Sequence, residues 1–472
     1  MVKQQSEHRV EKDLLGEKKI PAEAYWGVHT SRALDNYQIT GFPLYNAPEL
    51  INALAAVKWA ATKANADLDT IPPELAKAIT QACKEIRTGK LHDQFVVDVI
   101  QGGAGTSTNM NANEVIANRA IEILGGRKGD YKLVHPIEHV NASQSTNDVY
   151  PTAVKIGLIN AITGLLAAME ELGEAFGEKS FEFRKILKIG RTQLQDAVPM
   201  TLGQEFATFS VMIGEDILRL REATSLISEI NLGATAIGTG INTDPEYASR
   251  ARHYLEEITQ LGLVTAADLV EATQDTGSFV QLSGVLKRVA VKLSKMCNDL
   301  RLLSSGPQAG LNEINLPPRA AGSSIMPGKV NPVIPEVVNQ VAFEVIGNDV
   351  TVTMAAEAGQ LQLNAFEPII AWSLFKSIYH LTAACKTLTK NCVLGITANE
   401  SLLRQRVEES ASLATSLNPY IGYDQASEIA KTALKTGRKV SELVLEKGLL
   451  SEQQLNEILR PEVLTRPRRI KL

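Results

Sequence analysis

The chain has 472 residues, which is too long for one ordinary hydrophobic core; at about 150 residues per domain, this length predicts about three domains. Lys and Arg number 48 against 53 Asp and Glu, so the formal net charge is −5, which argues against nucleic acid or an anionic membrane as the main partner. Apolar residues make up 44% and charged residues 21%, the balance of a globular protein and not of a disordered one.

The cysteines and the N-terminus indicate a cellular compartment. Four cysteines without a CxxC pair are too few for a disulfide scaffold, and structural zinc is not expected. Residues 1–20 carry charge throughout and contain no apolar segment, so we expect no signal peptide. No run approaches about 18 uninterrupted apolar residues, so we expect neither a transmembrane helix nor a membrane partner. Together these features predict a cytoplasmic protein.

The two ends of the chain differ from its middle. Residues 1–50 are rich in glycine and proline turn formers and show little periodicity, and we expect helices near residues 50–67 and 73–89 to follow. After about residue 400 the pattern breaks into short helices. There Ser451, with Gln454 three residues later, predicts a capping box at the start of a final helix.

The middle of the chain has the clearest periodicity. Four runs space their apolar residues three and four apart, the pattern of one apolar stripe on a long helix. Several such helices in sequence predict a mainly α fold with a near-parallel bundle of long helices at its centre. The four runs extend from Leu158 to Phe176, from Phe206 to Ile227, from Leu282 to Leu303 and from Ile370 to Cys392.

Four polar segments interrupt the helical pattern, and they are named here the first to fourth islands. They are GGAGTSTNMNANE (102–114), NASQSTND (141–148), GRTQLQD (190–196) and GSSIMPGKVNP (322–332). The islands share Ser, Thr, Asn and Gln, with Lys329 among their few charged residues. Neutral hydrogen-bond donors with a cation suit a small substrate that bears carboxylates, and not a metal ion or a phosphate chain.

Other chemistries are excluded by the motifs that they need. GGAG is not followed by GK[ST], so the first island is not a P-loop, and no GxGxxG opens a strand-to-helix turn. GxSxG and HExxH are both absent. We therefore expect no metal ion and no cofactor.

Each island also has a purely structural interpretation. The glycines of the first island are ordinary turn residues, Ser145, Thr146 and Asn147 are candidate N-caps, and Thr192 and Gln193 suit a simple loop. A Gly/Ser-rich stretch such as the fourth island is usually a linker. This one is short and carries apolar residues, so a lid that closes on a site is an equally good interpretation.

At this point the motifs resemble a family. GSSIMPGKVNP is similar to the signature of the aspartase/fumarase superfamily, and the other islands resemble its remaining blocks in the same order, from about Val10 to about Leu459. The KVN of the signature is similar to aspartases and fumarases, and differs from argininosuccinate and adenylosuccinate lyases. Fumarases carry GRTH where this chain has GRTQ at residues 190–193, and PVIPEVVNQV at 332–341 resembles the aspartase branch.

The resemblance implies an architecture. It predicts an N-terminal lyase domain at residues 1–145, a central long-helix bundle at 146–401 and a small helical C-terminal domain at 402–472. It also implies a homotetramer in which each active site gathers blocks from three subunits. Apolar stripes that are broad for one isolated bundle agree with such an assembly.

The resemblance further implies a reaction, the reversible elimination of ammonia from L-aspartate to give fumarate through an enediolate. Ser323 would be the base, as an alkoxide supported by backbone N–H groups and the charge of Lys329. The neutral donors around the enediolate would be Thr106, Ser145, Thr146 and Ser324. The α-carboxylate would be held by Thr192, Lys329 and Asn331, and the amino group would lie near Thr106, Asn147 and Gln193.

Three positions and two alternatives stay open. Gln193 stands where other members have His, Gln308 stands where the family usually has Arg, and His139 is equally well structural or catalytic. The first alternative is a class II fumarase-like hydratase that acts on malate and fumarate. The second is a non-catalytic structural protein on the same scaffold, as lens crystallins are.

Overall fold

The computed structural model describes residues 7–467. Residues 1–6, which belong to the segment where we expect no signal peptide, lie outside the described residues. The chain forms two compact units. Unit one comprises the residues up to 166 with 218–288 and 343–381, and unit two comprises 167–217, 289–342 and the residues from 382 onward. The division into three domains at residues 145 and 401 stays a prediction.

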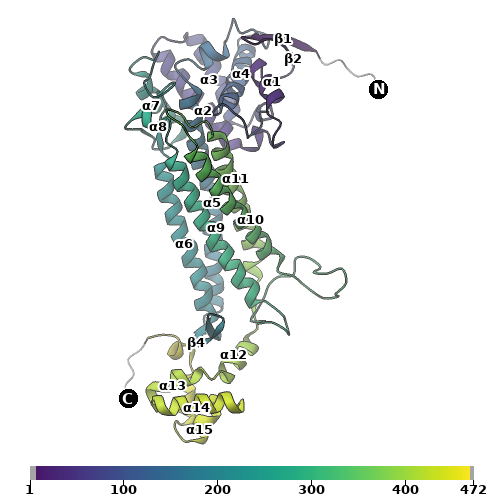
Figure 1. The fold of residues 1–472 in the computed structure, drawn as a ribbon, viewed down its shortest axis with the longest axis vertical. Coiled ribbons are helices and arrows are strands. Elements are labelled where there is room, and N and C mark those ends of the chain that lie inside the picture. Colours follow the sequence, from purple (N-terminus) through teal and green to yellow (C-terminus); the bar gives the residue numbers. More distant parts are fainter. Residues whose placement is uncertain (1–6, 468–472) are drawn as a thin grey trace. The chain divides into compact units, whose positions relative to one another are not determined.

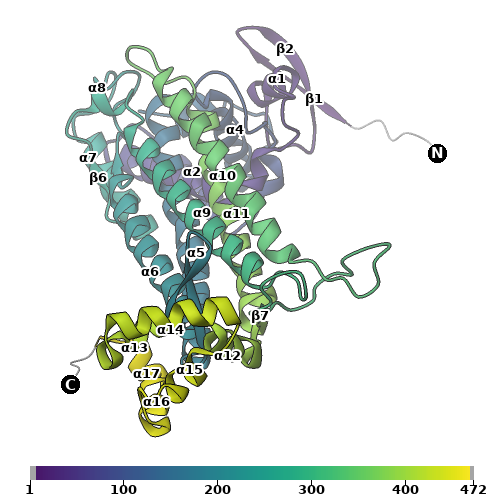
Figure 2. The same cartoon turned by 60° about the horizontal axis from the view of Figure 1, so that its bottom comes forward.

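Four of five long helices carry the predicted stripes, and the five together confirm the mainly α bundle fold. Nearly every residue of the four stripes is buried; Ile217 is half-buried. Within each unit, segments of these helices run side by side (Figures 1 and 2). The helices are α5 (Thr146–Glu182), α6 (Leu202–Leu226), α9 (Gly277–Leu303), α10 (Val333–Glu357) and α11 (Glu367–Asn391).

Unit one adds shorter elements around its helix segments. The Ala-rich α2 packs against α3 and α7, and α3 packs against α4; α2 and α3 each begin with a proline, whose fixed φ suits the first helical turn. The two predicted early helices are thus confirmed. The shorter helices are α1 (Val28–Asn36), α2 (Pro48–Asp67), α3 (Pro73–Arg87), α4 (Thr106–Ile123), α7 (Tyr247–Thr259) and α8 (Leu269–Ala272). The strands are β1 (His8–Asp13) antiparallel to β2 (Gly16–Pro21), and β5 (Glu229–Ile230) parallel to β6 (Val264–Thr265).

Unit two combines two antiparallel strand pairs with a group of short helices that Figure 2 brings forward. The short helices share a small core with Ile189 of the first strand pair. The predicted capping box at Ser451 and Gln454 is confirmed. The strand pairs are β3 (Leu187–Thr192) with β4 (Gln195–Thr201) and β7 (Ile314–Asn315) with β8 (Thr397–Ala398). The helices are α12 (Glu400–Glu409), α13 (Leu413–Ile421), α14 (Tyr423–Thr436), α15 (Val440–Glu446), α16 (Glu452–Ile458) and α17 (Pro461–Leu464).

By length and apolar composition alone, α5 is the one described helix that could cross a bilayer. Of its most apolar window, 67% is buried inside the protein, as in the core helix of a soluble fold. One such helix is therefore weak evidence for a membrane protein.

A glycine fixes how α4 begins. Gly105 caps α4 with φ of 90°, and a Cβ atom built on it would lie 2.5 Å from the ring of Tyr150 in α5. This close approach sets the start of α4 against the start of α5. The first and second islands lie at these two helix starts.

We expect Gly105→Ala to lower the free energy of unfolding by about 3 kcal/mol, because left-handed strain adds to overpacking against Tyr150. Gly125→Ala is the matched control, since Gly125 also has positive φ but would place its Cβ in open space. That change should cost about 1–2 kcal/mol. Thermal and urea unfolding of both variants test the difference, and equal losses would contradict the close-approach argument.

Candidate active site

The second island is built around a buried carboxylate at the start of α5. Asp148 is wholly buried and accepts hydrogen bonds from the backbone N–H groups of Ser145 (2.9 Å), Gly233 and Thr235 (3.0 Å each). Burial raises the pKa of Asp148 to about 6, although these hydrogen bonds favour the ionised form. The Oγ of Ser145 accepts from Asn147 N, so Ser145 also acts as the predicted helix cap.

A buried lysine lies under the same island. Lys58 of α2 donates to Asn141 Oδ1 at 2.8 Å and to Gln144 Oε1 at 2.9 Å. Burial lowers the pKa of Lys58 to about 7, an effect that the charge of Asp148 partly offsets. Sequence analysis missed Lys58, although a lysine among the apolar residues LAAVKWAA of a helix was a usable signal.

The first island is joined to the second by side-chain hydrogen bonds. Asn109 Nδ2, in the first turns of α4, donates to Thr146 Oγ1 and to Asn141 Oδ1, at 3.1 Å in each case. Thr106 is exposed at the start of α4, with its Oγ1 donating to Gly103 O at 2.7 Å. The structure therefore brings together the neighbourhoods of Thr106, Ser145 and Thr146 in unit one.

A cavity of about 410 Å³ opens over the second island, with Ser145 and Thr146 in its lining. Its opposite wall comes from residues 235–242, which sequence analysis did not single out. In this wall, Ala236 O accepts a hydrogen bond from Asn147 Nδ2 at 2.7 Å. The side-chain oxygen of Asn147, Oδ1, is therefore left to accept a hydrogen bond. The loop lacks a motif that would have identified it.

The open position His139 lies in a five-residue π-helix, Pro136–Val140, which sequence analysis also missed. Its Nδ1 accepts from His135 N at 2.9 Å, and burial lowers its pKa. This hydrogen bond fixes the orientation of the ring, and π-helices are frequent near functional sites. Gln308, the other departure, is exposed in the segment between α9 and β7.

The third island is the turn of the β3–β4 hairpin in unit two. Gln193 and Leu194 both have positive φ (53° and 62°), as a tight two-residue hairpin turn requires. Thr192 and Gln193 are exposed at this turn. Arg191 points instead into the protein, where its Nη2 lies 2.6 Å from Glu313 Oε1.

The fourth island folds back on itself between β7 and α10. Gly322 N donates to Lys329 O (2.8 Å), and Asn331 Nδ2 donates to Gly322 O (2.7 Å). A Cβ atom on Gly322 would lie 2.3 Å from Lys329 O, so only glycine fits this closure. Inside the loop, Ser323 Oγ accepts from Ile325 N at 3.2 Å and Met326 N at 2.9 Å.

These two bonds matter chemically because backbone N–H donors aimed at an oxygen favour its negative form. Ser324 and Lys329 are exposed on the same loop.

The described hydrogen bonds of residues 7–467 do not join the third island to the fourth. Within that part of the chain, no group of three or more His, Cys, Asp or Glu side chains could hold a metal ion.

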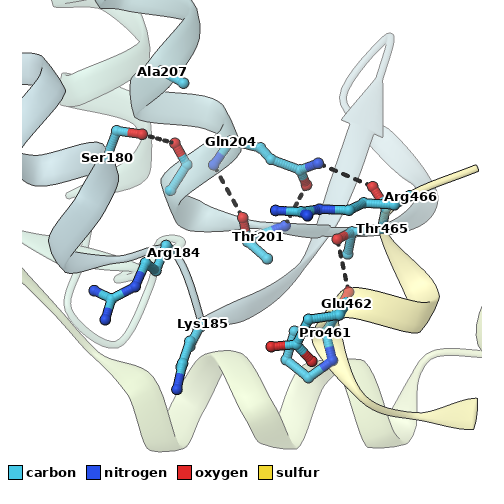
Figure 3. Close-up of a pocket in the computed structure, with 11 residues that line it drawn as sticks. Ser180, Arg184, Lys185, Thr201, Gln204, Ala207, Pro461, Glu462, Thr465 and Arg466 are labelled. Carbon is cyan, nitrogen blue, oxygen red and sulfur yellow. Dashed lines mark hydrogen bonds between the residues drawn. The ribbon is translucent and has the colours of Figure 1, made fainter.

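A separate cavity of about 370 Å³ lies where β4 meets α6 and the C-terminal helix α17 (Figure 3). Thr201 and Gln204 cap α6 by exchanging hydrogen bonds, and Gln204 Nε2 donates to Thr465 O at 3.0 Å. Arg184 and Lys185 add positive charge at the rim. No island residue lines this cavity, so it stands apart from the candidate site.

Comparisons with known proteins agree over nearly the whole chain. Family models described as "Lyase" and "Fumarase C C-terminus" match residues 16–347 and 413–466. Aspartate ammonia-lyase of Pseudomonas aeruginosa is 58% identical over 98% of each chain. The solved "fumarate lyase:delta crystallin" of Brucella melitensis bound to cobalt is 54% identical with a TM-score of 0.95, over 98% of this chain and 100% of that one. A class II fumarase of Schistosoma mansoni is 34% identical with a TM-score of 0.89, over 96% and 98%.

Proposed function

The chain belongs to the aspartase/fumarase superfamily of lyases, and we propose that within it this protein is an aspartate ammonia-lyase. It catalyses the reversible elimination of ammonia from L-aspartate to give fumarate. The observation that carries the proposal is the pair of backbone N–H groups bonded to Ser323 Oγ inside the superfamily signature. They supply the environment that a serine base needs.

The difficult step is the removal of a proton from the carbon beside a carboxylate. Ser323 takes this proton as an alkoxide, and the electron pair moves into the β-carboxylate, which becomes an enediolate with a second negative charge. Preorganised donors stabilise this charge by about 3 kcal/mol each. Thr106, Ser145, Thr146 and Ser324 are the donors that we assign to it.

The rest of the substrate needs one cation and two acceptors. Lys329, with Thr192 and Asn331, holds the α-carboxylate; Arg191 is not available for this role because it is paired with Glu313. The ammonium group donates three hydrogen bonds and accepts none, so it needs acceptor oxygens. Asn147 and Gln193 provide them, and Asn147 Nδ2 is already engaged with Ala236 O.

We also propose the homotetramer, with sites that combine residues of three subunits, in a cytoplasmic protein of three domains (1–145, 146–401 and 402–472). Large apolar side chains on the long helices support an assembly, because a monomer would expose them to water. Phe343, Val350 and Met354 lie on α10 at helical spacing and are 61%, 55% and 66% exposed. Val211 of α6 and Val291 of α9 are also exposed.

We expect the chain to release fumarate from L-aspartate with a kcat/KM at least about a hundredfold above that for L-malate, roughly 2.7 kcal/mol in transition-state binding. Gln193 cannot protonate and repel an ammonium group, and no acid is assigned to a hydroxyl leaving group. Fumarate absorbance with both substrates on one preparation measures the ratio. Equal use of malate would favour the fumarase-like alternative, and no reaction with either would favour the structural one.

We expect Ser323→Ala to lower kcat for aspartate by about a thousandfold or more while a dicarboxylate inhibitor still binds, because Ser323 acts on the proton and not on affinity. Ser249→Ala, on the exposed face of α7, is the control and should keep the parent's turnover. Initial rates and inhibitor titration measure the two effects. Turnover of Ser323→Ala within tenfold of the parent would refute its assignment as the base.

Shared sites predict that two inactive variants rescue each other in mixed tetramers. Thr146 lies in unit one and Ser323 in unit two. A site that takes residue 146 from a Ser323→Ala subunit and residue 323 from a Thr146→Ala subunit therefore has both native side chains. With random mixing, about one quarter of sites would be intact, as symmetry requires. Co-refolding, native mass measurement and an activity assay test this. Confirmed mixed tetramers without recovered activity would contradict shared sites.

A further inference from the structure

A buried ion cluster lies under the third island in unit two. Glu313 is 1% exposed and Lys188 is 2% exposed. Lys188 Nζ lies 2.7 Å from Glu313 Oε2, and Arg191 Nη2 lies 2.6 Å from Glu313 Oε1. Arg406 of α12 is a more distant third cation, 3.6 Å from the same carboxylate, and Lys188 also pairs with Glu205. One carboxylate therefore joins two cations of strand β3.

The hairpin is distorted between the two cations that share Glu313. Side chains alternate between the two faces of a strand, so residues 188 and 191 of a regular strand would point to opposite faces. The pairing register of β3 with β4 shifts between Ile189 and Arg191, as in a β-bulge. The extra residue lies in β4, where Ala197 and Val198 stand opposite the single residue Gly190 of β3. Next to this distortion, Lys188 and Arg191 both reach Glu313.

The backbone of Glu313 is itself fixed. Its N–H donates to Leu303 O at 2.8 Å, and its carbonyl accepts from Asn399 N at 2.9 Å. Glu313 directly precedes β7, which pairs with β8. The chain runs from β7 into the fourth island. The carboxylate thus ties the hairpin of the third island to the root of the fourth.

The turn of the hairpin has little support of its own. Thr192 and Gln193 are exposed, and Leu194 is 69% exposed. The position of these side chains therefore depends on how the stem of the hairpin is held. In the stem, Lys188 and Arg191 are the charged anchors, and Arg191 directly precedes Thr192.

We propose that Glu313 is a positioning residue, which holds Thr192 and Gln193 in place for the α-carboxylate and the amino group of the substrate. This inference rests on the proposed function for the identity of the substrate. It does not make Glu313 catalytic, because Glu313 acts through Arg191 and Lys188. It differs from a purely stabilising ion pair by predicting an effect that is specific to the hairpin.

The test compares Glu313→Gln with Asp216→Asn, a matched loss of a buried carboxylate in the same unit. Asp216 is 2% exposed and lies 3.0 Å from Lys292, and neither residue belongs to an island. We expect Glu313→Gln to raise the KM for aspartate at least about tenfold more than Asp216→Asn does. Hydrogen exchange should accelerate in residues 187–201 for Glu313→Gln and not for the control. Equal changes in KM and in exchange for the two variants would overturn the proposal.

Two further variants separate positioning from folding. Glu313→Asp keeps the charge, so its KM for aspartate should lie between those of the parent and of Glu313→Gln. It serves as the test variant if Glu313→Gln does not fold. Thr192→Ala combined with the Glu313 variant should raise KM clearly less than the product of the two single fold-changes, since both act on one contact. A double variant whose fold-change in KM equals that product would overturn the proposal. If the parent chain does not deaminate aspartate, the proposed function fails, and exchange in residues 187–201 alone decides whether Glu313 holds the hairpin.

Discussion

The wholly buried carboxylate of Asp148, bonded to three backbone N–H groups, represents the constraint on which this structure depends. A charged group without water must be satisfied by fixed partners, and removing one partner of a buried ion pair costs about 3–5 kcal/mol. Lys58 beneath the second island and Glu313 beneath the third obey the same rule. The polar islands look like loops, but each of these two is held by a buried group that tolerates little displacement.

The long helices show which parts of the fold could be predicted from sequence. The stripes of α5, α6, α9 and α11 bury one face each, so period alone identified them. Helix α10 was not identified because apolar residues occupy both its buried side, as Val338 and Val345, and its exposed side, as Phe343 and Val350. Its pattern is typical of a helix with two covered faces.

The candidate site was accessible from sequence only as a set of motifs. The motifs named exposed and half-buried polar residues, because those residue types carry the chemistry. They did not name Lys58, Glu313 or the wall at residues 235–242, since each acts through partners about 80 to 125 positions away in the chain. The bulge of β4 opposite Gly190 and the positive φ of Gln193 depend on pairing geometry, which local composition does not specify.

On the proposed mechanism, the chemistry of the fourth island imposes opposing demands on Ser323. Backbone N–H donors make its alkoxide easier to form, but the same bonds make that alkoxide a weaker base. Exclusion of water strengthens electrostatic interactions, which on the same mechanism include the attraction between Lys329 and the substrate carboxylate. In one copy of the chain, Ile325 is 83% exposed, Met326 47% and Val330 51%. Apolar side chains around a base serve catalysis when something covers them, so on the proposed mechanism this loop reaches its working state when it is closed over substrate or packed against another subunit.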